Sequence, residues 1–87
     1  MSLDLDLVLR ALSHPDRRRF VLACRDNPRP AGELAELSSL SPAAVSEHLK
    51  LLRLSGLLVL DRRGRHWLYK TDPAVLSATL KQLRTML

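Results

Sequence analysis

Apolar residues recur along most of this chain every three or four positions, the spacing that places side chains on one face of an α-helix. In the last third the pattern changes to two short apolar runs separated by a charged turn, which is typical of a β-hairpin. The pattern predicts helices at residues 3–12, 15–25, 31–37, 42–55 and 73–87, and strands at residues 57–60 and 66–70. We therefore expect a mostly α-helical fold with a small β-hairpin, in the α+β class.

Residues that favour helix boundaries stand where these segments begin and end. Pro15 begins the second predicted helix, because proline fits the first helical position, where its missing N–H costs nothing. Ser41 followed by Pro42 is a strong start signal, since a serine side chain caps the free N–H groups of the first turn. Gly56 is placed to end this fourth helix, and Gly64 supplies the turn of the hairpin.

Length and composition fit one small domain. The chain has 87 residues, of which 46% are hydrophobic and only 3% are aromatic. The core must therefore be built mainly from Leu, Val and Ala, which favours helices over an aromatic-rich sandwich of strands. We expect residues 1–87 to form a single domain. Domains of this size bury only about 60% of their chain surface, so a partner subunit would add stability.

Residues 31–55 have the features of a helix-turn-helix, two helices that pack closely across a short turn. Close packing needs a small residue at the crossing and apolar residues facing inward from both helices. The residues that meet this need are Leu34, Ala35, Leu40 and Val45. Ser39 occupies the turn position where many such motifs have glycine, so a left-handed backbone there would carry a strain of about 1 kcal/mol. The alternative is that Ser38 and Ser39 only end a helix in an ordinary α-helical domain.

The positive charge of the chain is concentrated in its second half. The net charge is +5, and residues 41–71 contribute +4 of it, because they hold six cationic residues and two anionic ones. The cations are Lys50, Arg53, Arg62, Arg63, Arg65 and Lys70. When a basic hairpin follows a helix-turn-helix, the second helix enters the DNA major groove and the hairpin contacts the backbone or the minor groove. We therefore predict that residues 57–70 form a wing and that the chain binds DNA.

Several motifs occur together and in order. They are Leu9-Arg10-Ala11-Leu12-Ser13-His14-Pro15-Asp16-Arg17, Glu33-Leu34-Ala35-Glu36-Leu37, the run from Ser41 to Arg53, Gly56-Leu57, and Arg63-Gly64-Arg65 followed by Trp67-Leu68-Tyr69. In these motifs, over nearly its whole length, the chain resembles the winged-helix repressors of the arsenical-resistance regulator (ArsR/SmtB) family. The resemblance implies a winged helix-turn-helix in the order helix, helix, short strand, helix, helix, strand, strand, helix. It also implies a homodimer joined through the terminal helices, within residues 1–14 and 73–87.

The terminal helices carry their own signs of a partner. Leucines in the last helix recur at spacings of four, three and four, which forms one apolar seam suited to a second helix. The alternative is that this seam packs on its own domain. The residues predicted at the dimer interface are Leu5, Val8, Leu9, Leu76, Leu80, Leu83 and Leu87. A symmetric dimer is expected to bind an inverted repeat whose half-sites lie about 34 to 36 Å apart.

The residues predicted to contact DNA lie on the fourth helix and the wing. Five residues match groove-facing positions of the family and are predicted to contact bases. They are Pro42, Ala43, Ala44, Ser46 and Glu47. Ala43 can touch a thymine methyl group, Ser46 can hydrogen-bond to several bases, and Glu47 can accept from cytosine N4. Those predicted at the DNA backbone or minor groove are Ser41, His48, Lys50, Arg62, Arg63 and Arg65. For the wing arginines, the alternative is a merely solvated turn.

The sequence lacks the residues by which metal-sensing members of this family commonly bind metal. Those members have cysteines on the third helix, where this chain has Glu-Leu-Ala-Glu-Leu, or Asp and His ligands on the last helix. Residues 74–87 contain no His, Asp, Glu or Cys, so thiolate, imidazole and carboxylate ligands are absent there. His14, His48 and His66 are dispersed along the sequence and are expected to pack or hydrogen-bond. We predict no metal and no cofactor.

Cys24 is the single cysteine of the chain and cannot form an intramolecular disulfide. It lies on an apolar helix face, so we expect a small core residue rather than a redox sensor. A lone thiol fits a reducing cytoplasm. No segment approaches the roughly 20 apolar residues of a membrane helix, so we expect a cytoplasmic protein that has no membrane partner.

The leading hypothesis is a homodimeric transcriptional repressor that binds double-stranded DNA; no residue pattern identifies an effector. A winged-helix module that binds protein or RNA is the alternative. An enzyme is not expected, because the chain has no glycine-rich phosphate loop, no paired carboxylates in a predicted cleft, and no nucleophile with a base and an orienting partner.

Overall fold

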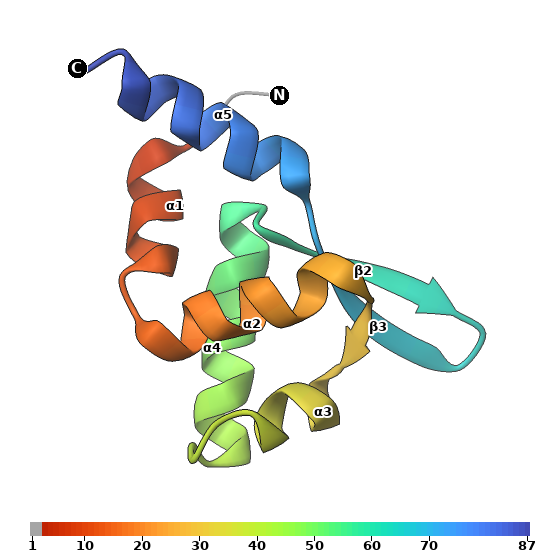
Figure 1. Ribbon diagram of the computed structural model, residues 1–87. Helices are drawn as coiled ribbons and strands as arrows, with labels where there is room; N and C mark the ends of the chain where they lie inside the picture. Colours follow the sequence, from red (N-terminus) through yellow and green to blue (C-terminus); the bar gives the residue numbers. More distant parts are fainter. Residues whose placement is uncertain (1–2) are drawn as a thin grey trace.

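The computed structural model describes residues 3–87 and has the element order predicted from the sequence (Figure 1). The helices are α1 (Leu5–Leu12), α2 (Pro15–Asp26), α3 (Ala31–Glu36), α4 (Pro42–Ser55) and α5 (Pro73–Arg84). The strands are β1 (Arg29–Pro30), β2 (Leu58–Arg63) and β3 (His66–Thr71). The prediction of a mostly helical fold with a small β-hairpin is confirmed. Residues 1 and 2, the first of the predicted segment 1–14, lie outside the described residues.

The boundary signals of the fourth predicted helix lie where the sequence placed them. The Ser41 side chain accepts a hydrogen bond from the backbone N–H of Ala44 at 3.2 Å, and Pro42 is the first helical residue of α4. Gly56 ends α4 in the left-handed conformation, with φ of 86°. Strand β2 runs to Arg63, three residues beyond the prediction, because its last three residues continue to pair with β3.

The three strands form one antiparallel sheet in the order β1-β3-β2. The register of β2 and β3 runs from Leu58 opposite Thr71 to Arg63 opposite His66. Gly64 makes the turn, with φ of 61°. Leu58 and Thr71 are buried at the base of the hairpin, whereas its tip is exposed. Figure 1 shows this hairpin extending beyond the helices as a wing.

The core of the described residues lies between the first four helices and the base of the wing. Phe20 of α2, Leu34 of α3 and Leu52 of α4 are fully buried in it. Ala35 and Leu40 are partly buried and pack against this cluster. The close crossing predicted for the helix-turn-helix is therefore confirmed, because small and apolar side chains from both helices meet in one core.

The turn between α3 and α4 differs from the sequence-based expectation. Among residues 3–87, no residue other than glycine has a positive φ, so Ser39 does not keep the left-handed conformation of the glycine and the strain that this conformation would cause is absent. The Ser38 hydroxyl donates to the carbonyl of Ala35 at 3.4 Å and accepts from the backbone N–H of Leu40 at 3.3 Å. These local hydrogen bonds shape the turn with right-handed or extended residues, so glycine is not needed.

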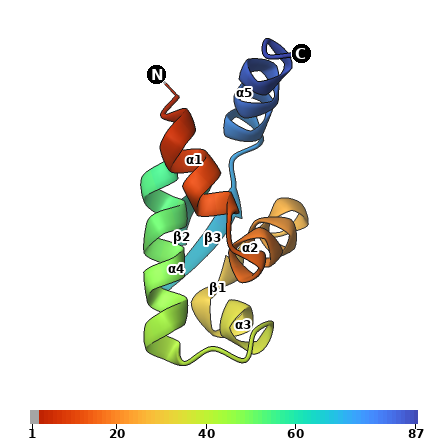
Figure 2. The same cartoon turned by 90° about the vertical axis from the view of Figure 1, so that its left-hand side faces the viewer.

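Helix α5 lies at the end of the molecule opposite α3, beside the start of α1 (Figure 1, Figure 2). Its first half is anchored, because Val75 and Thr79 are buried and Leu76 is partly buried against the core. Its second half is open to solvent, and the Leu80 side chain is 62% exposed. The last helix therefore holds to its own domain by one end only.

Candidate nucleic-acid interface

The first turns of α4 have one side in the core and one side free. Val45 and Leu49 are buried, and they fix the rotation of the helix about its axis. The residues predicted to contact bases are Pro42, Ala43, Ser46 and Glu47, which are exposed, and Ala44, which is half-buried. Ser41 and Lys50 are exposed as well. Figure 2 shows α4 along one edge of the molecule, with its N-terminal end beside α3. The groove of a DNA duplex can therefore approach this edge of α4 without displacing another helix or strand of the described residues.

His48, on the same helix, is only partly available. Its Nδ1 atom lies 2.9 Å from Nη1 of Arg17 on α2. An arginine guanidinium can only donate, so Nδ1 of His48 accepts this hydrogen bond and carries no proton. Only the far ring nitrogen of His48 remains free to reach a phosphate. The predicted backbone contact of His48 is therefore limited to Nε2.

Arg17 was not assigned a role from the sequence, yet it makes several contacts where α1, α2 and α4 meet. Its Nε donates to the carbonyl of Ala11 at 2.7 Å, and its Nη2 donates to the carbonyl of Arg10 at 3.0 Å. Both carbonyls belong to the last turn of α1, where helix carbonyls lack partners within the helix. Burial lowers the pKa of Arg17, and the neighbouring charge of Arg10 lowers it further. The guanidinium therefore joins α1, α2 and α4.

His14 and His48, which are distant in the sequence, meet in the structure. Their ring centroids are 4.4 Å apart and the rings are tilted by 42°. His14 precedes α2 and caps it, because its Nδ1 accepts from the backbone N–H of Asp16 at 3.1 Å. No local sequence pattern predicts this pair, because the contact depends on how α2 packs against α4.

The three wing arginines have different surroundings. The Arg63 guanidinium lies 3.1 Å from the Asp61 carboxylate, so its charge is partly neutralised. Arg62 lies over the Trp67 ring, 4.7 Å from the centroid, and Trp67 is 51% exposed. Arg65 is exposed beside the turn glycine. Trp67 was not assigned a role from the sequence, although a two-residue turn at 64–65 places positions 62 and 67 opposite each other.

Cys24 is buried in the core, as predicted. Burial raises the pKa of its thiol to about 11, although the nearby Arg29 acts in the opposite direction. The thiol is therefore protonated near neutral pH and is a poor nucleophile. Among residues 3–87, no three His, Cys, Asp or Glu side chains lie close enough together to hold a metal ion.

Comparison with known proteins agrees with this arrangement. The family described as "Helix-turn-helix domain" matches residues 12–61. The regulator YgaV of Escherichia coli is 32% identical over 82 residues, which cover 91% of this chain and 81% of YgaV. The chain belongs to the ArsR/SmtB family of helix-turn-helix regulators. Helix α4 and most of β2 lie at the end of the matched region, and β3 and α5 lie beyond it.

Other ArsR/SmtB relatives match over a shorter part of their own length. The regulator NmtR of Mycobacterium tuberculosis is 41% identical over 61 residues, which cover 70% of this chain and 51% of NmtR. The chain thus spans about half the length of this curated relative, and 47% of the repressor SmtB from the same species. An ArsR-like transcriptional regulator from Rhodococcus sp. RHA1 has a TM-score of 0.88 at 28% identity, covering 94% of this chain and 75% of that one.

The terminal helices of this ArsR/SmtB member expose part of the predicted dimer surface. Leu9 is 40% exposed, and Leu5 and Leu83 are half-buried. Leu87 is fully exposed but lies beyond α5, because this helix ends at Arg84 and not at residue 87 as predicted. Val8, by contrast, is completely buried in the core of its own chain, so its assignment to a partner surface is corrected. The cause is helical rotation, because Val8 and Ala11 point inward while Leu9 points outward.

None of the helices within residues 3–87 is long and apolar enough to cross a membrane.

Proposed function

We propose that this protein is a homodimeric transcriptional repressor that binds an inverted-repeat DNA operator. The observation that carries the proposal is the exposed side of α4, which lies opposite its buried residues and faces no other element of the described chain. Membership of the ArsR/SmtB family supports the same function. A regulator of this kind acts by occupying DNA, and the proposal assigns it no reaction to catalyse.

In this proposal the first two turns of α4 contact base edges. Ala43 offers a methyl group to thymine, Ser46 offers a hydroxyl that both donates and accepts, and Glu47 accepts from cytosine N4. Pro42 and Ala44 complete the surface through van der Waals contacts. With few polar side chains on this face, sequence preference depends on a small number of base pairs.

The backbone contacts provide affinity in this proposal. Ser41 and the free Nε2 of His48 reach phosphates beside the groove, together with Lys50 on the next turn of α4. Arg62, Arg63 and Arg65 place positive charge at the flanking backbone or minor groove. Each phosphate contact releases counterions, so affinity should fall steeply as the salt concentration rises.

The homodimer is proposed to form through α1 and α5. The exposed leucines of these helices support it, because they leave an apolar surface at the end of the domain that lies opposite α3. The interface residues in this proposal are Leu5, Leu9, Leu76, Leu80, Leu83 and Leu87. Two copies related by a twofold axis would each present α4 to one half-site, about 34 to 36 Å apart.

Selection of bound sequences from random duplex DNA tests this function. Enrichment of an inverted repeat supports it, and the spacing of the two half-sites reports the dimer geometry. Equal binding to the selected repeat and to random duplex would count against it and favour a protein-binding or RNA-binding module. Sedimentation of the free protein checks the dimer separately, and a monomer at all accessible concentrations would exclude it.

Substitution of Lys50 or Arg63 by alanine tests the backbone contacts. Each variant should weaken binding about tenfold and lower the salt dependence by about one phosphate contact per site, because a charged hydrogen bond is lost. Arg25→Ala is the matched control, since Arg25 is exposed on α2 and pairs with Asp26. Unchanged affinity in both test variants would remove these residues from the interface.

A further inference from the structure

Three side chains that are distant in the sequence meet where α1 turns into α2 and both pack on α4. They are His14 before α2, Arg17 on α2 and His48 on the recognition helix. We refer to these three residues as the corner cluster. The Arg17 and His48 positions are 31 residues apart, and their hydrogen bond of 2.9 Å is a direct side-chain link between α2 and the recognition helix.

Each histidine in the corner cluster uses the lone pair of Nδ1. In His48 this lone pair accepts from Arg17, and in His14 it accepts from the backbone N–H of Asp16 and so caps α2. A proton on either Nδ1 would remove the corresponding hydrogen bond, because a protonated imidazole has only donors. Protonated rings with centroids 4.4 Å apart would also repel each other and the Arg17 guanidinium.

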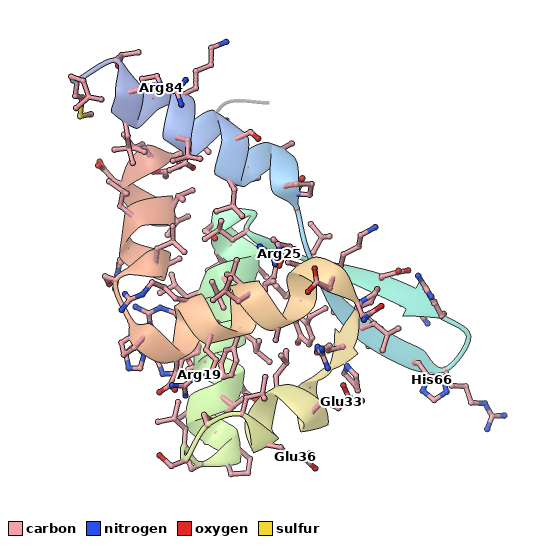
Figure 3. All side chains as sticks on the ribbon, in the orientation of Figure 1. Arg19, Arg25, Glu33, Glu36, His66 and Arg84 are labelled. Carbon is pink, nitrogen blue, oxygen red and sulfur yellow. The ribbon has the colours of Figure 1, made fainter. Side chains whose placement is uncertain are left out.

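The charged groups that face His48 come from all three helices. Arg10 of α1, Arg17 of α2, and Glu47 and Lys50 of α4 line the same shallow pocket as His48. Asp16 is the nearby anion of α2: its Oδ1 accepts from Arg19 at 2.9 Å, and its Oδ2 lies 3.9 Å from Nδ1 of His14. Figure 3 shows Arg19 at this corner, near the start of α2. The surroundings of His48 therefore hold three cations and two anions, one of which is already paired.

Burial lowers the pKa of His48, and positive charge on His14 and Arg17 lowers it further, while Asp16 acts in the opposite direction. Unprotonated His48 therefore contributes stability to the folded chain above the pKa of an unfolded histidine, about 6.5. That contribution is lost as the pH falls below this value, because the unfolded chain then binds more protons than the folded one. Lowering the pH is therefore expected to lower the stability of the folded chain.

We propose that the corner cluster makes DNA binding by this protein sensitive to acid, because unprotonated His48 ties the recognition helix to Arg17, and through Arg17 to α1 and α2, and a proton on its Nδ1 breaks this contact. The proposal rests on the DNA-binding function proposed above. It concerns the orientation of α4, since the groove-facing Ser46 and Glu47 immediately precede His48. Without the Arg17–His48 contact, this part of α4 is held only by its buried residues, so these side chains are placed less precisely and the operator is bound less well.

The direction in which acid changes DNA affinity distinguishes this proposal from a simpler one. If His48 only contacted a phosphate, protonation would add a positive charge at the DNA and acid would strengthen binding. If the corner cluster holds the helix, acid weakens binding. The same titration therefore gives opposite results for a positioning role and for a direct contact.

The double variant His14→Asn/His48→Asn is the most informative test. An asparagine Oδ1 atom stands close to the place of Nδ1, so it can accept from Arg17 at position 48 and cap α2 at position 14, but it does not titrate. Affinity for the selected inverted-repeat duplex is measured between pH 7.5 and 5.5 at constant ionic strength, and each protein is normalised to its own value at pH 7.5. The wild-type affinity should fall about threefold to tenfold more than that of the double variant.

His66→Asn is the matched control, because His66 is exposed near the tip of the wing (Figure 3) and lies outside the corner cluster. Its pH profile should follow that of the wild type. Parallel profiles for the wild type and the double variant would overturn the proposal. A relative gain of wild-type affinity in acid would overturn it as well and would leave the phosphate contact proposed above as the only role of His48.

Two measurements without DNA keep this result separate from the DNA-binding proposal. Thermal unfolding between pH 7.5 and 5.5 should destabilise the wild type more than the double variant; equal losses would overturn the corner cluster as an acid-sensitive device. NMR of the wild-type histidine rings should show His48 protonating at a lower pH than in a peptide of residues 44–52, and the reverse order would overturn it. Failure to bind any inverted repeat at pH 7.5 would reject the DNA-binding function alone.

Discussion

The recognition helix and the wing carry the residues proposed to contact DNA, but they are held in different ways. Helix α4 is fixed by Val45, Leu49 and Leu52 in the core and by the Arg17–His48 hydrogen bond at its edge. The wing beyond its buried base is held by strand pairing, one exposed ion pair and one contact between Arg62 and Trp67. The helix therefore has a defined orientation, whereas the tip of the wing depends on weak interactions.

This difference suits two kinds of contact with DNA. Hydrogen bonds to base edges require donors and acceptors at fixed positions, so a helix that rests on a packed core is suited to sequence recognition. Contacts to phosphates depend mainly on charge and tolerate local movement. In the proposed function, sequence preference therefore belongs to the first turns of α4, and salt-dependent affinity belongs to the wing together with Lys50. The following substitutions probe how firmly the two regions are held and how charge acts at the wing.

The largest effect is expected where α4 meets the core. Leu52 is fully buried, so Leu52→Ala should lower the free energy of unfolding by about 2 to 5 kcal/mol through lost burial and a residual cavity. Leu54→Ala on the same helix is the control, because Leu54 is 65% exposed, and its effect should stay below about 1 kcal/mol. Urea denaturation measures both. Similar losses in the two variants would mean that the exposed side of α4 is also packed, for instance against a second copy.

An intermediate effect is expected from the two glycines with a left-handed backbone. Gly56 closes α4 beside the Val75 side chain, so Gly56→Ala should cost about 1 kcal/mol in global stability. Gly64 has open space at the tip of the wing, where a turn can rearrange with little effect on the core. Gly64→Ala should therefore change hydrogen exchange in the wing more than the global unfolding midpoint. Equal changes in the midpoint would show that the wing unfolds together with the core.

The smallest effect is expected at the ion pair of the wing. Asp61→Asn removes the anion beside Arg63, so affinity for DNA should rise by about twofold to fivefold at low salt, and the gain should shrink as salt screens the charge. Fluorescence of Trp67, the single tryptophan, reports binding at the wing directly. Asp26→Asn is the matched control, since Asp26 pairs with Arg25 on α2. An equal gain in the control would indicate net charge rather than a contact at the wing.

Local interactions made much of the fold predictable. The cap at Ser41, the proline that follows it and the glycine at position 56 act within a few residues, so the ends of α4 followed from the sequence. The alternation of buried and exposed positions likewise placed Val45 and Leu49 inside the protein. The residues proposed for the interface could be named from the sequence for the same reason, because they lie on one helix and one hairpin.

Only the tertiary structure decided which distant residues meet. The contact between the tilted rings of His14 and His48 and the contact of Arg17 depend on the angle at which α1 and α2 pack on α4, and periodicity carries no information about that angle. The same packing buried Val8, which a leucine-rich helix alone did not reveal. The sequence by itself thus determined the elements and the charge of the binding face, because these depend on near neighbours. The corner that holds the recognition helix was decided by packing between segments that are far apart in the chain.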